Sequence, residues 1–429
     1  MTMTINRSLP VHSTVRHWPG VVAAALTATV TVMPGFTIGA LAPSIEADLQ
    51  ISRNAVGLAM SVFYAATAFG SPVAKRVVVR LPISTVLAVA ALVASAVMLV
   101  ASRATGPGML TAALLVGGLS NALVQPVAGR LIAARVPEHR RSLAAGAIGA
   151  ALGAGTVVPG LLVALVLPAY GWRAALLAAG IVALVPAAFA PLTRAPDRPR
   201  PTRQRETSEA GGAGRASAAR GSGGAGGEAG RTGQSGPAGD GQRTLGRVLA
   251  LWALAAALSA TGNNAVATYF VELGTHAGLG TALTGNLLSL SALFAIAVRI
   301  TAGALTDRAP RRNPAVIVTM MLTGGLGLAL IAIGTSTTFV LGAILAFSAG
   351  WGWTGLLLAT TLRLVPGRTE DAGHTVQVGV YAGATIAPFA FGALSSTFGF
   401  PATALVAAVA AVAAAAAMAS GALLLRRSG

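Results

Sequence analysis

Charged residues are scarce in this chain, and cysteine is absent. Only 10% of the 429 residues are charged, against about 25% in an ordinary soluble domain. Without cysteine there is no disulfide framework, no thiolate zinc or iron–sulfur site and no cysteine nucleophile. The five histidines show no His-Glu-x-x-His spacing. We therefore expect neither a metal nor a cofactor.

Lysine and aromatic residues are also rare. Lys75 is the sole lysine and is followed by Arg76, which excludes a phosphate-binding loop that ends in Gly-Lys and Ser or Thr. Aromatic residues make up 5% of the chain, too few for a platform on which bases stack. The net charge is +18, but the basic residues lie in short clusters between long uncharged runs. No nucleic-acid partner is therefore expected.

Long apolar segments dominate what remains. Hydrophobic residues make up 54% of the chain, and about 20 apolar helical residues cross a bilayer core of about 30 Å. The sequence predicts an all-α membrane protein with twelve transmembrane helices in two pseudo-symmetric six-helix bundles. The segments are 19–41, 54–74, 82–102, 108–131, 142–167, 172–192, 246–271, 283–305, 314–334, 337–362, 373–396 and 401–425. Within the first, Pro34-Gly35 predicts a break.

The basic residues orient these segments. With both termini in the cytoplasm, all of the 30 Lys and Arg except Arg53, Arg103 and Arg173 fall at cytoplasmic ends, in cytoplasmic loops or in the central linker. Cytoplasmic loops are enriched in Lys and Arg. This predicts a multi-pass protein of the cell (plasma) membrane with cytoplasmic termini, whose positive charge reflects topology and contact with anionic lipids.

The composition changes abruptly in the middle of the chain. Residues 193–243 are rich in Arg, Pro, Gly, Ser and Ala with almost no large apolar residue, which predicts a disordered cytoplasmic linker. It divides the chain into a bundle over 1–192 and a second bundle over 244–429. Such duplication is typical of secondary transporters, in which the substrate binds at the midplane between the halves.

A motif after the eighth segment carries a family resemblance. Gly303-Ala304-Leu305-Thr306-Asp307-Arg308-Ala309-Pro310-Arg311-Arg312 resembles the major facilitator superfamily signature Gly-x-Leu-Ala-Asp-Arg-x-Gly-Arg-Arg, with Pro310 at the second glycine. The matching stretch after segment 2 is worn, with Lys75 and Val79 at the glycine and aspartate positions. Residues 350–355 (Gly-Trp-Gly-Trp-Thr-Gly) and 377–381 (Gln-Val-Gly-Val-Tyr) also look like regions of bacterial members.

This resemblance implies alternating access, with the motif acting as a gate. The implied gating residues are Gly303, Asp307, Arg308, Arg311 and Arg312. An aspartate at a helix end can accept charge-assisted hydrogen bonds from arginines or face the positive N-terminus of another helix. The plain alternative, a loop that follows the positive-inside rule, explains the arginines but not the acid among them.

Polar side chains at midplane depth are the candidate substrate ligands, because such groups are costly unless they face a cavity or a partner. They are Asn121, Gln125, Asn263, Asn264, Tyr64, Trp353, Gln377 and Tyr381. Each has a structural alternative: amides hydrogen-bond between helices, and tryptophans pack.

No acid lies at midplane depth. Glu272, at the end of segment 7, is the first candidate for proton coupling, and His374 is the second. Arg299 is the one charge inside a segment and is expected to snorkel to the cytoplasmic face. These features favour a neutral or weakly charged organic substrate.

We interpret the chain as a secondary active transporter of a small organic solute, not an enzyme, and expect a monomer in the lipid bilayer. Segment 5, with its glycines and Pro159, favours a proton-linked antiporter for efflux. The alternatives are an uptake permease for an organic nutrient, working as a symporter or facilitator, and more distantly a non-transporting receptor of the same fold.

The gating hypothesis predicts that Asp307→Asn lowers the transport rate by about 10-fold, because the neutral side chain loses a charge-assisted contact that is made in one conformation. The measurement is transport per molecule of protein in membranes. Unchanged transport at normal expression would show that Asp307 has no gating role.

Overall fold

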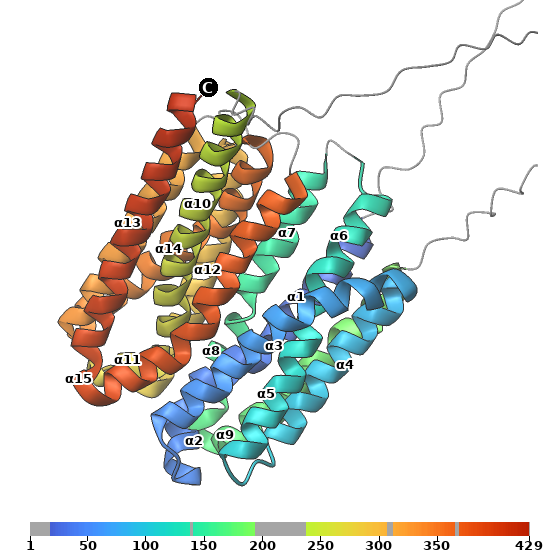
Figure 1. Cartoon of the computed structure of the whole chain (residues 1–429). Helices are drawn as coiled ribbons and strands as arrows, with labels where there is room; N and C mark the ends of the chain where they lie inside the picture. Colours follow the sequence, from blue (N-terminus) through green and yellow to red (C-terminus); the bar gives the residue numbers. More distant parts are fainter. Residues whose placement is uncertain (1–17, 138–139, 194–236, 307–311, 365–368, 429) are drawn as a thin grey trace, which may run out of the picture.

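The computed structural model describes residues 18–137, 140–193, 237–306, 312–364 and 369–428. Within these ranges all regular structure is helical (Figure 1). The N-terminal half comprises α1 (Trp18–Ala40), α2 (Ala42–Leu49), α3 (Arg53–Arg80), α4 (Ile83–Ala101), α5 (Pro107–Ala122), α6 (Val124–Arg135), α7 (Arg141–Ala154), α8 (Val157–Leu165), α9 (Leu167–Phe189) and the short 3₁₀ helix η2 (Ala190–Thr193). The C-terminal half comprises α10 (Pro237–Thr268), α11 (Phe270–His276), α12 (Thr281–Thr306), α13 (Asn313–Ile333), α14 (Ser336–Leu364) and α15 (Thr369–Ser428).

The predicted count of twelve spans is confirmed. In the described residues, 11 helical segments are long and apolar enough to cross a membrane. The last, Ala372–Arg427, has 56 residues and contains a kink at Gly399, where φ is +78°. Glycine adopts this backbone conformation without steric cost. Figure 1 shows that α15 turns back on itself and that its two arms cross the bundle in opposite directions, so this segment supplies two of the twelve spans.

Proline interrupts two spans, but not the one predicted. The expected break at Pro34-Gly35 is wrong, because α1 continues through Pro34. Instead, span 4 is interrupted at Leu123, between α5 and α6, and span 5 is interrupted between α7 and α8. In each case a proline, Pro126 or Pro159, follows a few residues later. A proline ring clashes with the carbonyl four residues back and has no N–H to donate. Proline also kinks helices without ending them, which is compatible with the course of α1.

Glycines let the helices approach closely. A Cβ atom on Gly118 of α5 would lie 2.2 Å from the Phe63 carbonyl oxygen of α3. Between the halves, a Cβ on Gly39 of α1 would lie 2.7 Å from the carbonyl oxygen of Thr268 in α10. Small residues at helix crossings give membrane helices their packing, because apolar burial does not drive association in lipid.

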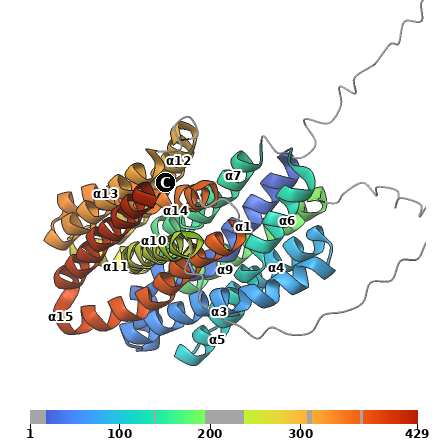
Figure 2. The same cartoon turned by 45° about the horizontal axis from the view of Figure 1, so that its top comes forward.

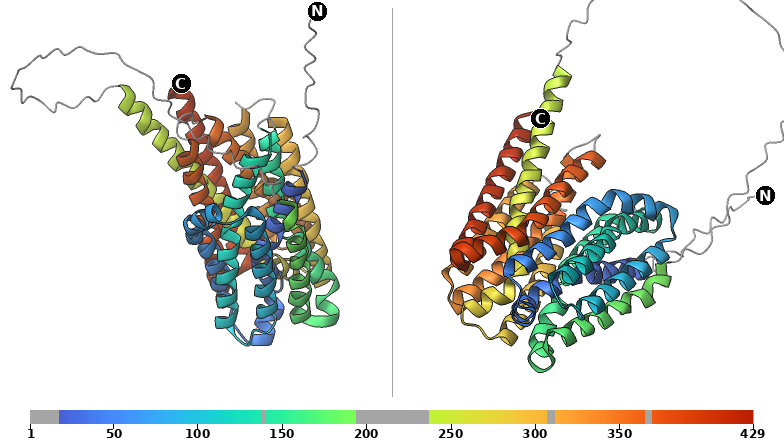
Figure 3. Two further views of the ribbon diagram at one scale, coloured as in Figure 1. Left: turned by 90° about the vertical axis from the view of Figure 1, so that its right-hand side faces the viewer. Right: turned by 60° about the horizontal axis from the view of Figure 1, so that its bottom comes forward.

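The two halves lie side by side and contact each other through a limited set of helices (Figure 2). The contacting pairs are α3 with α15, α12 with α7 and α8, α1 with α10 and α11, α2 with α11, and α14 with α7. The right-hand view of Figure 3 shows the same division from another direction.

The bundle has two distinct ends. α2 and α11 lie at one, which we call the α2–α11 end, and the C-terminus lies at the other (Figure 1). The start of α1 lies at the same end of the bundle as the C-terminus, because α1 crosses the bundle once before α2 begins at the opposite end. The charge distribution predicts that the α2–α11 end is extracellular, and this orientation stays a prediction.

The predicted central linker falls mainly on residues 194–236, which lie outside the described residues. On its C-terminal side, α10 begins at Pro237, and its membrane-crossing part begins at Arg243. The division into 1–192, 193–243 and 244–429 therefore stays a prediction.

The packing predicts opposite effects for two glycines. Gly118→Ala should lower the melting temperature by several degrees, because the added Cβ forces α5 from α3 at a cost of about 1–3 kcal/mol. Gly129→Ala is the matched control. Its Cβ would meet nothing within 4 Å, and alanine favours the helix over glycine. Thermal unfolding of the two purified variants is the measurement; equal melting temperatures would contradict this packing.

Candidate functional site

A charged cluster lies where the two halves meet at the α2–α11 end. Glu46 lies on α2, just beyond the interruption that follows α1 at Leu41. Arg53 opens α3, where the Ser52 hydroxyl accepts a hydrogen bond from the Ala55 N–H at 3.3 Å. Glu272 lies on α11, just beyond the interruption at Tyr269. Equivalent interruptions in spans 1 and 7 thus bring one acid from each half to the same place.

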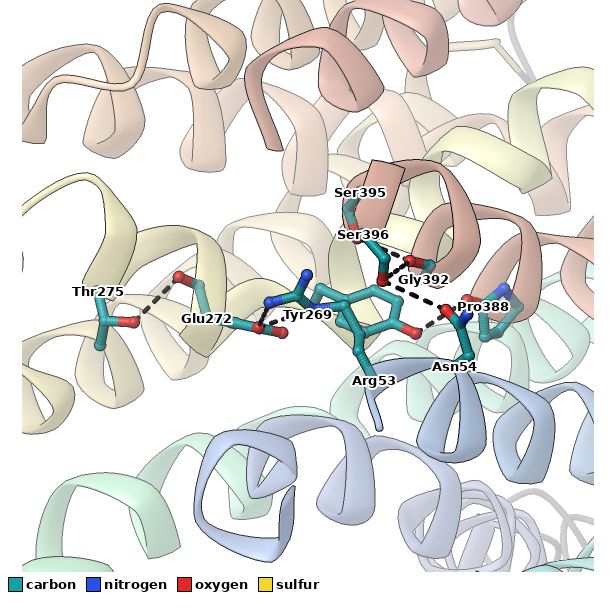
Figure 4. Close-up of polar contacts among 9 residues, drawn as sticks. All are labelled: Arg53, Asn54, Tyr269, Glu272, Thr275, Pro388, Gly392, Ser395 and Ser396. Carbon is teal, nitrogen blue, oxygen red and sulfur yellow. Dashed lines mark hydrogen bonds and ion pairs between the residues drawn. The ribbon is translucent and has the colours of Figure 1, made fainter. Parts of the chain in front are cut away.

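An ion pair between Arg53 and Glu272 joins the halves (Figure 4). The Arg53 Nε donates to Oε1 of Glu272 at 2.8 Å, and Nη2 donates to the same oxygen. The side chains are 24% and 13% exposed, so water screens this contact less than a surface pair. The Arg53 guanidinium also lies 4.5 Å from the centre of the Phe400 ring, a favourable cation–π contact.

Glu46 is the unusual member of the cluster. Its Oε1 and the Glu272 Oε2 are buried and accept no hydrogen bond among the described residues. Burial, together with the negative charge of Glu272, raises the pKa of Glu46 to about 7, although Arg53 opposes the shift. Glu46 therefore exchanges its proton near neutral pH.

Neutral contacts extend the junction along α3 and α15. The Tyr269 hydroxyl donates to the Pro388 carbonyl at 2.9 Å, and its ring stacks on Phe391 with centroids 5.3 Å apart. The Ser396 hydroxyl donates to the Asn54 side chain at 3.4 Å (Figure 4). Further along the helices, the Phe389 N–H donates to the Ser61 hydroxyl at 3.1 Å.

Two of the predicted substrate ligands meet at the boundary of the halves. Tyr381 of α15 lies close to the side chains of Gln377 on the same helix and Ser71 on α3. The predicted pair on span 4 diverges: Asn121 donates to the Thr67 hydroxyl at 3.3 Å inside the N-terminal half, whereas Gln125 is exposed.

The other predicted ligands are mostly engaged in helix packing. Asn263 donates to the Gly350 carbonyl of α14, and Asn264 donates to the Ala260 carbonyl one turn back at 2.9 Å. Trp353 is fully buried in a hydrophobic cluster of the C-terminal half. Tyr64 is buried, and its hydroxyl has no hydrogen-bond partner among the described residues. Whether any of these residues contacts substrate stays a prediction.

Most of the predicted gate lies outside the described residues, namely Asp307, Arg308 and Arg311. Gly303 lies in the last turns of α12, and Arg312 is exposed next to the start of α13. His374 is exposed near the start of α15 and is not part of the Arg53–Glu272 cluster.

Arg299 departs from its predicted placement. Instead of snorkelling, it turns toward α14 and α7. Its Nε and Nη2 donate to the Trp351 carbonyl at 3.2 and 2.9 Å, and its Nη1 donates to the Gly149 carbonyl at 3.0 Å. Sequence analysis also missed Glu46 and Arg53, whose partners are distant in the chain. The signal available for Glu46 was an acid that follows the first span, as Glu272 follows the seventh.

The raised pKa of Glu46 predicts how stability depends on pH. Between about pH 4.5 and 7 the folded chain holds this proton more tightly than the unfolded chain, so stability should fall as pH rises through this window and level off above it. Because Glu46 is partly exposed, we expect a loss of about 1–2 kcal/mol.

The measurement is thermal unfolding between pH 5 and 8. Glu46→Gln should flatten the dependence and raise the melting temperature at pH 8. Asp48→Asn is the control, since a hydrogen bond from Arg173 lowers the pKa of Asp48, which leaves it ionised throughout this range. An unchanged slope in Glu46→Gln would refute the assignment.

Comparisons with known proteins agree with this architecture. The sequence model of the Major Facilitator Superfamily matches residues 23–376. A gallate transporter from Pseudomonas putida is 31% identical over 166 residues, which are 38% of this chain and 36% of the relative, so the chain matches only about a third of that protein's length.

Two solved structures share the fold across nearly the whole chain. Both are of a bacterial homologue of the human lysosomal transporter Spinster in an inward-facing conformation. The unoccupied form has a TM-score of 0.64 at 15% identity and covers 97% of this chain and 98% of its own. The occupied form has a TM-score of 0.65 at 14% identity and covers 97% of both chains. The family match over most of its length and the twelve-span fold show that this chain belongs to the Major Facilitator Superfamily of membrane transporters.

Proposed function

We propose that the chain is a proton-coupled secondary transporter that moves a small organic solute by alternating access. The observation that carries the proposal is the cluster of Glu46, Arg53 and Glu272, which joins the two halves at one end. A protonatable group at a contact made in one conformation couples proton binding to the conformational equilibrium. Of the two predicted coupling residues, this favours Glu272 over His374.

The charges of the cluster set the direction of the coupling. With Glu46 protonated, Arg53 faces a single carboxylate, and the buried charges balance. With Glu46 ionised, a second negative charge enters the same buried space, where it costs free energy and repels Glu272. A proton on Glu46 therefore favours closure of the α2–α11 end, and its loss favours opening.

We propose efflux by exchange for protons across the plasma membrane, by a monomer with cytoplasmic termini. The glycine-rich span 5 in the sequence supports this direction. In this orientation a proton enters from the extracellular α2–α11 end and closes it. The inward-facing conformation of the similar structures accords with closure at one end.

Uptake is the second candidate, and the partial match to a gallate transporter favours it. In this version a small aromatic acid moves with the proton instead of against it. The cluster serves either direction, because only the point in the cycle at which solute binds differs.

The test is transport in proteoliposomes under an imposed pH gradient. A thermal-shift panel of antibiotics, sugars, organic acids and amino acids first supplies the labelled solute, because a ligand stabilises the folded protein by mass action. An antiporter accumulates the solute in the acidic compartment, and a proton symporter accumulates it in the alkaline one.

Glu272→Gln should lose at least about 10-fold of the gradient-driven accumulation while retaining exchange of labelled for unlabelled solute, because exchange needs no net proton movement. Asp48→Asn, which removes an exposed acid at the same end, should behave like the unchanged chain. Full gradient-driven accumulation by Glu272→Gln would contradict the proposed coupling.

A further inference from the structure

Arg299 places a positive charge inside a membrane span. It lies on α12, within the candidate span Thr281–Ala302. Charged side chains at such depth are expensive and commonly mark substrate or ion pathways. The Arg299 guanidinium is held at the junction of α12 with α7 and α14 by hydrogen bonds to the carbonyls of Trp351 and Gly149.

The contacts of Arg299 give hydrogen-bond acceptors to its N–H groups but do not neutralise the charge of its guanidinium. Three of its donors reach main-chain carbonyls, two bonds going to Trp351 and one to Gly149 of the other half. Both acceptors are neutral. Arg299 forms no ion pair with any acid in the described ranges, where the recorded pairs belong to Arg53 and Arg173. A guanidinium has five N–H groups, so donors remain for a further acceptor.

Aromatic side chains from both halves lie beside this charge. The Arg299 guanidinium lies 5.9 Å from the centre of a ring of Trp351. Phe36 of α1 meets Trp351 edge to face with ring centroids 5.4 Å apart, and the Phe347 ring is tilted against Trp351 with centroids also 5.4 Å apart. Charge and aromatic surface are therefore contiguous where α1 and α7 of one half face α12 and α14 of the other.

Glycines on α7 make this approach possible. A Cβ on Gly153 would lie 2.7 Å from the Arg299 Nη1, so a larger residue there would displace the guanidinium. A Cβ on Gly149, one turn earlier on α7, would meet nothing within 4 Å.

We propose that Arg299 binds the carboxylate of a small aromatic acid, with Trp351 and Phe36 against its ring. This rests on the proposed transport function and names its substrate class. A guanidinium binds a carboxylate through two parallel charge-assisted hydrogen bonds, and an aromatic ring packs favourably on Trp and Phe. One arginine without an acidic partner among the described residues matches one negative charge. A carboxylate that takes the Nη1 donor from Gly149 also loosens a contact between the halves, which links binding to movement.

The test compares benzoate with benzamide, which has nearly the same shape but no charge. Binding to the purified full chain in lipid nanodiscs is measured by calorimetry and by tryptophan fluorescence. We expect benzoate to bind at least about 10-fold more tightly than benzamide, and Arg299→Gln to lose at least about 10-fold in benzoate affinity. Arg130→Gln is the matched control, since Arg130 also donates to main-chain carbonyls, those of Val78 and Leu81, but inside one half.

Equal affinity for benzoate and benzamide in the unchanged chain would overturn the proposal, as would full benzoate affinity in a folded Arg299→Gln. If Arg299→Gln does not fold, Trp351→Phe decides: it should remove most of the fluorescence response to benzoate, and an undiminished response would also overturn the proposal.

The proteoliposome assay separates this proposal from proton coupling. If a pH gradient drives another solute but benzoate does not bind, the Arg299 site is rejected and the proposal of proton coupling is kept. Benzoate binding that depends on Arg299, without any effect of a pH gradient, supports the site and rejects the coupling.

Discussion

Among the described residues, the ion pair between Arg53 and Glu272 is the one salt bridge that joins the two halves, and the proposed coupling depends on it. It holds the halves together at the α2–α11 end, because Arg53 is the first residue of α3 and Glu272 lies on α11, which follows span 7. Uncharged contacts reinforce it, among them the hydrogen bond from Tyr269 to the Pro388 carbonyl and the stacking of Tyr269 on Phe391. Uncharged contacts of this kind persist across neutral pH, whereas the balance of charge around Arg53 changes with the protonation of Glu46. The packing of the junction therefore does not depend on pH near neutrality, whereas its net charge does.

Arg299 provides a second polar contact between the halves. Arg299 contacts the other half through the neutral Gly149 carbonyl and has no acidic partner among the described residues, whereas Arg53 is already paired with the Glu272 carboxylate in this conformation. A carboxylate at Arg299 and a proton at Glu46 would each change one inter-half contact. Because both act on the same equilibrium between conformations, the two ligands influence each other's binding.

The sequence predicted the fold well because the bilayer imposes a simple length rule. Each span is a long apolar run, and the merged α15 still divides at Gly399 close to the boundary expected between the last two spans. Local interruptions were harder to predict. Pro34 was expected to break a helix that continues, whereas Pro126 and Pro159 follow interruptions that periodicity alone does not reveal.

The site was only partly predictable, since side-chain pairing between distant spans leaves no local pattern. Glu272 could be proposed because few acids lie near a span, but its partner Arg53 is 219 positions away. Arg299 was identified from the sequence as a charge inside a span, but its side chain was wrongly expected to reach the cytoplasmic face. An arginine near a span end looks the same in the sequence whether its side chain extends to water or turns toward the other half. The amides Asn263 and Asn264 illustrate the converse: their depth suggested ligands, and their recorded hydrogen bonds go to main-chain carbonyls.

The most direct test of the account measures the separation of the halves at the α2–α11 end as a function of pH. The chain has no cysteine, so spin labels can be attached through Ala47→Cys and Gly280→Cys, both exposed positions, without removing native thiols. The account predicts one short distance at pH 6, a growing population of longer distances as Glu46 ionises toward pH 8, and a short distance at both pH values once Glu46→Gln is added. A distance that does not change with pH, or the same shift in Glu46→Gln, would contradict it.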